Sequence, residues 1–373
     1  MASPPFQTSI RLSGQFAAAT GRMKPGRIAG LLLFGLLSAL RVAPQDVLPQ
    51  TEILFGSCLF QRRPYPILAT IAERRPDLFI FMGDNIYADT INPQIMRREY
   101  AKLAANPLYQ RLLATCPVLA TWDDHDYGAN DAGADFPMRE DSQQLFLDFW
   151  NVPPDSARRA RPGIYDSWLI GPAGRQVQIL LLDTRYFRDP LQSGSQPATV
   201  ARGPYVPNPA GTLLGESQWR WLEQELVQPA RLRLIVSSTQ VIPVESGWEG
   251  WANFPAERRR LLELLGRLRV TGVILLSGDR HFAEISRLER EGAYPLYEIT
   301  SSALNLRFPA AKPNPNQFRL GGYYLEENFG SVEIQWSEIP QLNLRVYDLH
   351  GRVRLELKLS LAELGFSERS PRP

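Results

Sequence analysis

Three apolar runs in this 373-residue chain each end in a short acidic motif. The segments are FIFMGDNIYAD (79–89), VLATWDDHDYGAND (118–131) and VILLSGDRHFAE (273–284). Two of the three histidines of the chain lie within them. Strand ends that carry polar turns converge at the edge of an open α/β sheet and build a site there. The three motifs therefore predict one site at such an edge, with enough hard ligands for a polynuclear metal centre.

Other apolar runs rich in Val, Ile, Leu and Phe alternate with helical patterns. Their near-continuous apolarity is typical of strands that are covered on both faces. Strands are expected at residues 53–57, 78–82, 118–121, 177–182, 232–237 and 273–276. Helices are expected at residues 66–74, 93–104, 142–150, 216–227 and 255–268. This alternation predicts an α/β fold.

The pattern changes after residue 293, where strands and turns follow one another. Strands are expected at residues 296–300, 332–336, 342–347 and 353–359. Several of them alternate apolar with polar residues, which is typical of antiparallel strands with one exposed face. Two stacked sheets with helices outside would accommodate this order around one core. The segment 189–215 is rich in Pro, Gly and Ser and too long for a simple connection, so we expect it to form a rim of the site.

The composition is that of a folded protein, with 44% hydrophobic and 10% aromatic residues. The net charge of +2 comes from the N-terminal region, because residues 1–45 contain five basic residues and no acidic one. The remainder is slightly acidic. No basic patch interleaved with aromatic residues stands out, so a nucleic-acid-binding module is not expected.

Residues 1–45 are expected to be a signal peptide or an N-terminal membrane anchor. Lys24 and Arg27 precede an apolar run at residues 28–40, and small residues follow, as in a secretory signal peptide. The run is shorter than the about 20 apolar residues that a transmembrane helix needs. A buried helix is the structural alternative. The protein is therefore expected to be secreted, periplasmic or anchored on the outer face of a membrane.

Several side chains of the first two motifs are candidate ligands. Asp84 follows a predicted strand, and Tyr87 would lie on the same side of one helical turn, so both oxygens could reach one ion. Capping of a turn is the alternative for Asp84. Four successive ionisable groups at residues 123–126 are costly to bury without a cation, so Asp124 is expected to bind metal. His125 is then available to hydrogen-bond a substrate oxygen or donate a proton.

The third motif and the two cysteines add further candidates. Asp279 and His281 alternate, so in extended backbone they share a face; a core histidine is the alternative for His281. Cys58 and Cys116 are the only cysteines. In an exported protein they could form a disulfide. The other interpretation makes Cys58 a metal thiolate.

The motifs together resemble the alkaline phosphatase D (PhoD-like) family of calcineurin-type metallophosphatases. The matching segments, in the order of the family, are FGSC, GDNIYAD, TWDDHDYG, LLDTRYFR, LGESQWRWLEQEL, WEGWANFPAERR and SGDRHFAE, spread over residues 52–305. The resemblance implies a four-layer αββα sandwich of two mixed sheets. The domain is expected at residues 50–360, with a β-rich completion at 294–360 and a tail at 361–373.

The resemblance also implies roles for individual residues. It makes Cys58 a ligand of ferric iron, Asp84 the bridging carboxylate and Tyr87 an iron-binding phenolate. Asp124 would hold the second metal, and His125 would stabilise the phosphate. The remaining ligands would be Asp279 on iron, His281 with a less definite role, and Asn130 loosely placed beside calcium. Members with these ligands use Fe³⁺ with Ca²⁺; Zn²⁺ or Mn²⁺ is the alternative.

The implied chemistry is hydrolysis of a small phosphoester, a monoester or a diester, by a metal-activated water. Arg185 is the candidate cation for the phosphate oxygens, because a guanidinium fork suits them; a salt bridge to Asp183 or another sheet-edge acid is the alternative. Arg280 departs from the family, which often has a small or apolar residue there.

The competing functions are a phospholipase-type phosphodiesterase at the membrane and a non-catalytic, metal-stabilised binding protein.

Overall fold

The computed structural model describes residues 49–366 apart from 196–202, 246 and 309–314. The predicted export segment at residues 1–45 lies outside this part of the chain. Residues 49 onward form one compact unit. Within the described residues, no helix has both the length and the apolar character needed to cross a membrane.

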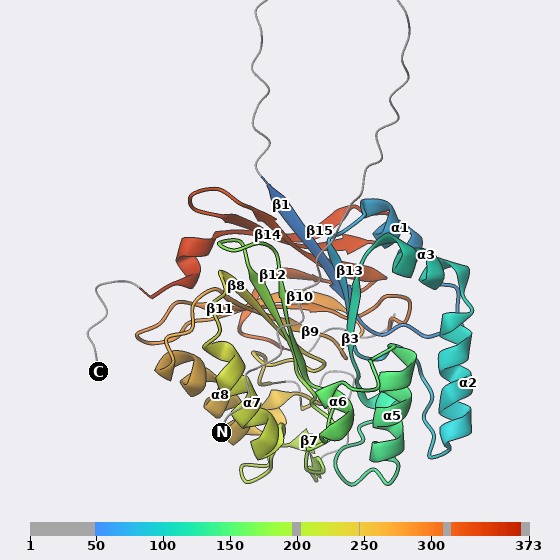
Figure 1. Ribbon diagram of the computed structural model, residues 1–373. Coiled ribbons are helices and arrows are strands. Elements are labelled where there is room, and N and C mark those ends of the chain that lie inside the picture. The colour runs from blue at the N-terminus through green and yellow to red at the C-terminus, as the bar shows by residue number, and fades with distance from the viewer. Residues whose placement is uncertain (1–48, 196–202, 246, 309–314, 367–373) are drawn as a thin grey trace, which may run out of the picture. The chain divides into compact units, whose positions relative to one another are not determined.

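Two large mixed sheets form the centre of this unit (Figure 1). The strands are β1 (Gln50–Gly56), β2 (Leu78–Met82), β3 (Val118–Thr121), β4 (Asp166–Ile170), β5 (Val177–Leu181), β6 (Gln192–Ser193), β7 (Tyr205–Val206), β8 (Leu232–Ser237), β9 (Val273–Ser277), β10 (Ala283–Leu288), β11 (Leu296–Ser301), β12 (Arg319–Tyr324), β13 (Asn328–Gln335), β14 (Gln341–Asp348) and β15 (Val353–Ser360). The first sheet has the order β15-β14-β13-β1-β2-β3, and the second has the order β12-β10-β11-β9-β8-β5-β4. The short strands β6 and β7 pair with each other.

Helices flank the two sheets. They are α1 (Ile67–Arg74), α2 (Pro93–Ala104), α3 (Pro107–Thr115), α4 (Asp124–Tyr127), α5 (Arg139–Phe149), α6 (Ala157–Ala160), α7 (Gly215–Leu226) and α8 (Pro255–Arg267), with 3-10 turns η1 (Trp251–Asn253) and η2 (Leu361–Leu364). In Figure 1, α1, α2, α3 and α5 lie on one side of the sheets, and α7 and α8 lie on the other. The predicted four-layer αββα sandwich is confirmed by this arrangement.

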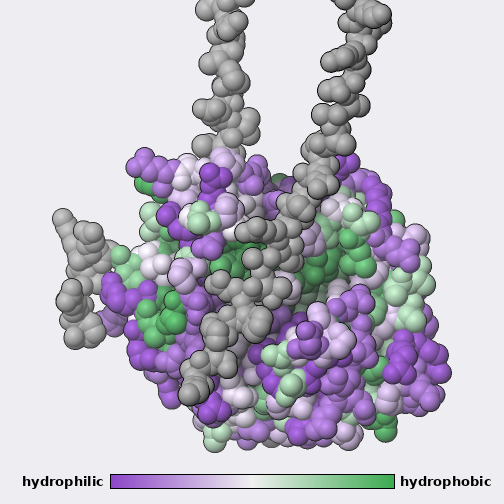
Figure 2. Space-filling model, in the orientation of Figure 1, coloured by the Kyte–Doolittle hydropathy of each residue, from purple (hydrophilic) through white to green (hydrophobic). Residues whose placement is uncertain are grey.

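Alternating side chains of the central strands explain the layers. In β2, Leu78, Ile80 and Met82 pack into the cluster shared with the second sheet and with α7 and α8. Phe79 and Phe81 point the other way, into the cluster formed with α1, α2, α3 and α5. Successive residues of a strand face opposite sides, so a continuously apolar strand must be covered twice. The apolar residues lie mainly inside, and the face in Figure 2 is largely hydrophilic with apolar residues in separate patches.

Most predicted elements are found, and the differences are local. The strands at 78–82, 118–121 and 232–237 and the helix at 93–104 have the predicted bounds. The helix α3 and the strands β4, β10 and β12 were missed. The helix α3 is short, β4 and β12 carry polar residues at a sheet edge, and β10 begins inside the third acidic motif, so none of them has a long apolar period. Of the predicted tail, Leu361 and Leu364 are buried in η2, and residues 367–373 lie outside the described part.

Parallel pairing brings the motifs together. Strands β1, β2 and β3 run parallel in the first sheet, and β5, β8, β9 and β11 run parallel in the second. The carboxyl ends of parallel strands meet at one edge. Each acidic motif therefore ends at the same edge of its sheet.

Candidate metal centre

The candidate ligands follow directly on strand ends. Cys58 comes two residues after β1, Asp84 two residues after β2, and Asp279 two residues after β9. Two glycines permit these ends to approach closely. A Cβ on Gly83, whose φ is +104°, would lie 2.6 Å from Cβ of Asp123, and a Cβ on Gly278 would lie 2.5 Å from Oγ of Ser57. Only glycine fits at such contacts without displacing a neighbour.

Strained backbone is concentrated at this edge. Of the nine non-glycine residues with positive φ in the described part, six are Cys58 (60°), Asp84 (51°), Asp89 (43°), Asp131 (56°), Asp279 (68°) and His281 (57°). Such conformations cluster at functional sites, where the surrounding structure holds them. The expectation that Asp279 and His281 share a face of extended backbone was wrong, because both adopt left-handed turns after β9.

A first group of possible ligands consists of Cys58, Asp84 and His281, whose donor atoms lie within 4.8 Å of one another. The Tyr87 hydroxyl donates to Oδ2 of Asp84 at 2.8 Å, so the predicted pairing of these oxygens is present although residues 85–88 are not helical. Nδ1 of His281 lies 2.8 Å from the carbonyl oxygen of Leu306. A carbonyl only accepts, so Nδ1 carries the proton and Nε2 is the available ligand atom.

A second group consists of Asp84, Asp124 and His125. Asp84 therefore belongs to two groups, which is the arrangement that a bridging carboxylate needs. Nδ1 of His125 lies 2.7 Å from Oδ1 of Asp89, and its ring lies 4.2 Å from the ring of Tyr87. These contacts hold the imidazole in one orientation.

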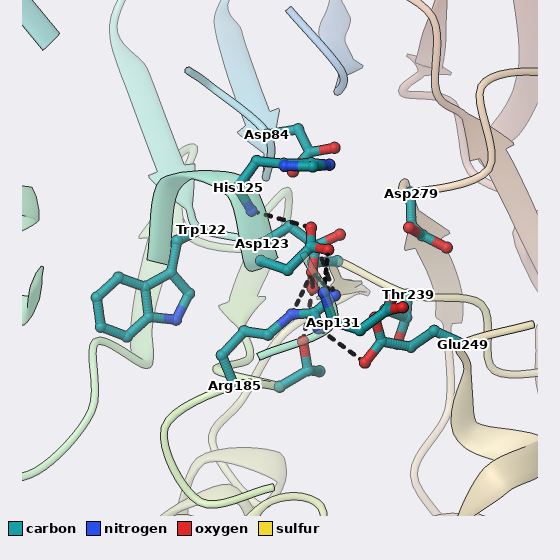
Figure 3. A network of polar contacts seen from close by, with 12 residues as sticks. Asp84, Trp122, Asp123, His125, Asp131, Arg185, Thr239, Glu249 and Asp279 are labelled. Carbon is teal, nitrogen blue, oxygen red and sulfur yellow. Dashed lines mark hydrogen bonds and ion pairs between the residues drawn. The ribbon is translucent and has the colours of Figure 1, made fainter. Parts of the chain in front are cut away.

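A third group consists of Asp124, Asp131 and Glu249. In Figure 3, the carboxylates of Asp123, Asp131 and Glu249 gather around Arg185, with Asp84 and Asp279 beside them. Sequence reasoning missed Asp131 and Glu249, as it missed Asp89. Asp131 closes the second motif, and Glu249 lies in the WEGWANF segment, so a count of acids near the motifs could have marked both.

The site favours the binding of cations because it buries more carboxylates than its own basic side chains can neutralise. Burial raises the pKa of Asp84 well above its usual range, and the neighbouring Cys58 and Asp124 raise it further. Burial also raises the pKa of Asp279, although Arg280 acts against this. Among the described residues, Oδ1 of Asp84 and Oε2 of Glu249 are buried with no hydrogen-bond partner. Buried carboxylate oxygens of this kind are normally satisfied, and metal ions would satisfy them.

Cys58 and Cys116 are both buried free thiols, so the disulfide is not formed. Sγ of Cys58 lies 3.4 Å from Oδ2 of Asp84 and 3.2 Å from Oγ of Ser302. Burial raises the pKa of the Cys58 thiol to about 12. A cation is therefore needed if Cys58 is to act as a thiolate ligand.

The sequence also predicted a role at the site for Asn130 and for the segment 189–215. Asn130 is exposed, and its amide donates to Oδ2 of Asp131 at 2.8 Å. The predicted rim segment reaches the site through Tyr205, whose hydroxyl donates to the same carboxylate.

Arg185 is fully buried beside the third group. Its Nε donates to Oδ1 of Asp123 at 2.6 Å, and its Nη1 donates to Oε1 of Glu249 at 2.7 Å. The alternative, a salt bridge from Arg185 to sheet-edge acids, is therefore present. Its partners are Asp123 and Glu249 and not Asp183, whose carboxylate accepts the backbone N–H of Arg185 at 3.0 Å. A contact with phosphate would require Arg185 to leave one of the two ion pairs.

The Arg185→Ala variant is expected to lose about 3–5 kcal/mol of stability, because it leaves buried carboxylates without their partner. Urea unfolding of the metal-loaded protein measures this loss. Arg175→Ala, at an exposed turn, is the matched control and should change stability by less than about 0.5 kcal/mol. An Arg185→Ala protein of unchanged stability that no longer binds phosphate would favour a direct phosphate contact instead.

The fold and the site define a class of protein. Two mixed sheets lie between helices, with overlapping groups of Asp, His and Cys donor atoms at the strand ends, as expected of a metallophosphatase of this fold. Residues 54–359 match the PhoD-like phosphatase family, and the chain belongs to this family. The resemblance seen in the motifs is thereby confirmed.

Individual relatives agree. Alkaline phosphatase D of Bacillus subtilis (strain 168) is 25% identical over 303 residues, which are 70% of this chain and 50% of that protein, so the chain spans about half the length of this relative. A solved structure of PhoD has a TM-score of 0.68 at 19% identity and covers 89% of this chain and 73% of its own. Purple acid phosphatase PPD1 from yellow lupin seeds has a TM-score of 0.55 at 12% identity, over 84% of this chain and 54% of its own. These two structures support the fold.

Proposed function

We propose that this chain is a metal-dependent phosphoric-ester hydrolase, an alkaline phosphatase acting on monoesters, diesters or both. The observation that carries the proposal is the sharing of ligands between adjacent donor groups. Asp84 belongs to the first and second groups, and Asp124 belongs to the second and third. Neighbouring cations held by shared carboxylates suit phosphoryl transfer, in which negative charge is spread over several oxygens.

Each metal has a proposed set of ligands. Cys58, Asp84, Tyr87, Asp279 and His281 would hold Fe³⁺, and the proximity of His281 to Cys58 and Asp84 supports its place in this set. Asp84 and Asp124 would hold Ca²⁺; Zn²⁺ or Mn²⁺ is the alternative. Bound cations would supply the charge that favours deprotonation of water and neutralises phosphate oxygens.

His125 is the proposed proton donor. Burial alone would lower its pKa, whereas the carboxylates of Asp84, Asp89 and Asp124 raise it. Bound cations would offset the charges of Asp84 and Asp124, so the ion pair with Asp89 is the contact that would favour a protonated imidazole. With Nδ1 held by Asp89 at 2.7 Å, Nε2 is available to donate to a phosphate oxygen or to the leaving group.

The assay that tests this proposal compares p-nitrophenyl phosphate with bis-p-nitrophenyl phosphate, together with elemental analysis of the purified protein. Hydrolysis of either substrate that is lost on chelation and restored by metal is the expected result. Turnover of the diester and of phospholipid vesicles, with little monoester turnover, would favour the membrane phosphodiesterase. Bound metal without turnover of any substrate would favour the binding protein.

The proposed thiolate and phenolate donors predict colour. Cys58 and Tyr87 bound to ferric iron should absorb visible light by charge transfer, and dithionite should bleach the band. Tyr87→Phe should weaken or shift it, whereas Tyr100→Phe, at a buried tyrosine on α2, should leave it unchanged. A colourless, fully active protein containing zinc or manganese would contradict the iron assignment and leave the phosphatase proposal intact.

Export by residues 1–45 is the remaining part of the proposal. Protein recovered from an outer compartment should have a mass consistent with removal of that segment, or should be retained on membranes if the segment stays as an anchor. Active full-length protein found only in the cytosol would contradict export.

A further inference from the structure

Tyr87 lies in a segment of backbone that has no regular structure. Residues 83–90 form neither helix nor strand, so the repeating hydrogen bonds of those elements do not fix the main chain there. The Tyr87 hydroxyl nevertheless lies 2.8 Å from Oδ2 of Asp84, the proposed bridging ligand. A metal ligand has to be held close to its productive position by the residues around it, so another part of the chain has to fix this segment.

The Gln61 side chain holds the backbone of Tyr87. Gln61 lies in the loop after β1 and is only 6% exposed. Its Oε1 accepts the backbone N–H of Tyr87 at 2.9 Å, and its Nε2 donates to the backbone carbonyl oxygen of Tyr87 at 3.1 Å. One side-chain amide thus pairs with both backbone polar groups of a single residue, as a neighbouring strand would pair with it.

Glu99 fixes the orientation of the Gln61 amide. Nε2 of Gln61 also donates to Oε2 of Glu99, on α2, at 2.8 Å. The amide nitrogen therefore faces two acceptors and the amide oxygen faces a donor, so a rotation by 180° would lose all three hydrogen bonds. Burial raises the pKa of Glu99, but hydrogen bonds, chiefly from Arg62 and Lys102, lower it to about 2. Glu99 is therefore a carboxylate at neutral pH and can only accept.

The two hydrogen bonds from Gln61 to Tyr87 involve backbone atoms of Tyr87 alone. A change at Gln61 therefore leaves the phenol chemically intact and acts on a bound metal only by moving the phenol. We propose that Gln61 is a positioning residue, which holds the Tyr87 backbone so that the phenolate oxygen reaches the cation bound by Asp84. This inference rests on the metal centre of the proposed function.

The test is a double-mutant cycle that combines Gln61→Met with Tyr87→Phe. Methionine is close to glutamine in size but lacks the amide, and phenylalanine removes the ligand oxygen and keeps the ring. The metal affinity of each purified protein is measured by elemental analysis after dialysis against graded chelator. Gln61→Met alone should weaken metal binding by about 10- to 100-fold, the usual cost of losing a residue that orients a metal ligand. In the Tyr87→Phe protein the same change should weaken it by less than about twofold, which is the usual error of additivity.

The visible spectrum gives a second measurement that does not depend on turnover. With ferric iron bound, Gln61→Met should weaken or shift the absorption band that Tyr87→Phe also weakens or shifts. The double variant should have the spectrum of Tyr87→Phe alone, because the phenolate that Gln61 positions is then missing. An unchanged band in a folded, iron-loaded Gln61→Met protein would contradict the inference.

Gln143→Met is the matched control. Gln143, on α5, is a second buried glutamine whose amide bridges backbone groups of a loop, and it is 4% exposed. Its Nε2 donates to the carbonyl oxygens of Arg158 and Arg161 at 3.1 and 2.7 Å, and its Oε1 accepts the N–H of Gly163 at 3.0 Å. Gln143→Met should lower the melting temperature about as much as Gln61→Met, because three hydrogen bonds are lost in each. It should leave the metal affinity and the absorption band unchanged.

Gln61→Glu covers the case in which Gln61→Met does not fold. It keeps the size of the side chain and an acceptor for the Tyr87 N–H, but it removes the donor to the Tyr87 carbonyl oxygen and to Glu99. Its metal affinity should also fall, and the fall should again depend on the Tyr87 hydroxyl. Wild-type metal affinity in a folded Gln61 variant would contradict the inference. An equal loss of affinity with and without the Tyr87 hydroxyl would make the role of Gln61 purely structural, and the inference would be wrong.

The outcomes separate this inference from the proposed function. A wild type that hydrolyses neither ester, but in which the effects of Gln61 and Tyr87 on metal affinity are coupled, would contradict the function and support the inference. An active wild type without that coupling would contradict the inference alone. The same holds for an active enzyme whose Tyr87→Phe variant keeps the full metal affinity.

Discussion

Asp84→Asn is expected to abolish hydrolysis of p-nitrophenyl phosphate and to lower the metal content of the purified protein. Asp84 belongs to two donor groups, and its carboxylate is within hydrogen-bonding range of Tyr87 and Cys58. An amide removes the negative charge and one strong ligand oxygen from both cations at once. The loss of activity should exceed about 10- to 100-fold, which is the usual cost of changing a residue that only hydrogen-bonds to a metal ligand.

Asp77→Asn is the matched control for this variant. Asp77 precedes β2, whereas Asp84 follows it, and Asp77 is exposed and accepts the backbone N–H of Glu52 at 2.8 Å. The same substitution at the opposite end of the same strand should leave activity and metal content unchanged. An Asp84→Asn protein with full metal content and more than a tenth of wild-type activity would rule out a bridging carboxylate.

His125→Ala should keep the metals and lower turnover by about 10²- to 10⁴-fold, the usual contribution of a positioned proton donor. Its imidazole is fixed by Asp89 and by the Tyr87 ring. Asp84 and Asp124, which lie beside it, remain able to hold cations. The measurement is kcat for p-nitrophenyl phosphate alongside elemental analysis.

The matched control uses the third histidine of the chain. His350 is exposed in the turn between β14 and β15, so His350→Ala should have wild-type turnover. Loss of metal from His125→Ala as complete as from Asp84→Asn would make His125 a ligand, and the division of roles between the two residues would be wrong.

Predictions from sequence succeeded where the signal was local. The strand β2 is five apolar residues bounded by Asp77 and Gly83, and α2 begins at a proline preceded by Asn92, whose side chain caps the helix. Such boundaries follow from turn and capping chemistry within a few residues. The strand β12 was missed because its residues are mostly polar or partly exposed, and only pairing with β10 makes it a strand.

The same distinction applies to the site. The structure brings together Cys58, Asp84, Tyr87, Asp124, His125 and His281, and each of them follows a buried strand within a few residues. An apolar strand followed by a polar turn can be recognised within one short stretch of sequence, so these residues were predicted as candidates. Asp89 and Asp131 end the first two motifs and Glu249 lies in the WEGWANF segment, but only the folded loops show that their carboxylates lie beside the site.

The sequence by itself determined most of the central strands, the polar motifs with candidate metal ligands at their carboxyl ends, and the family to which the chain belongs. These properties are encoded in short segments whose apolar and polar residues specify strand and turn. Only the tertiary structure decided the partners of Arg185, which are 62 and 64 residues away in Asp123 and Glu249. It also placed Arg280 beside Trp248. Contacts between distant segments arise from the packing of two sheets and their loops, and local pattern carries no information about which charges that packing will pair.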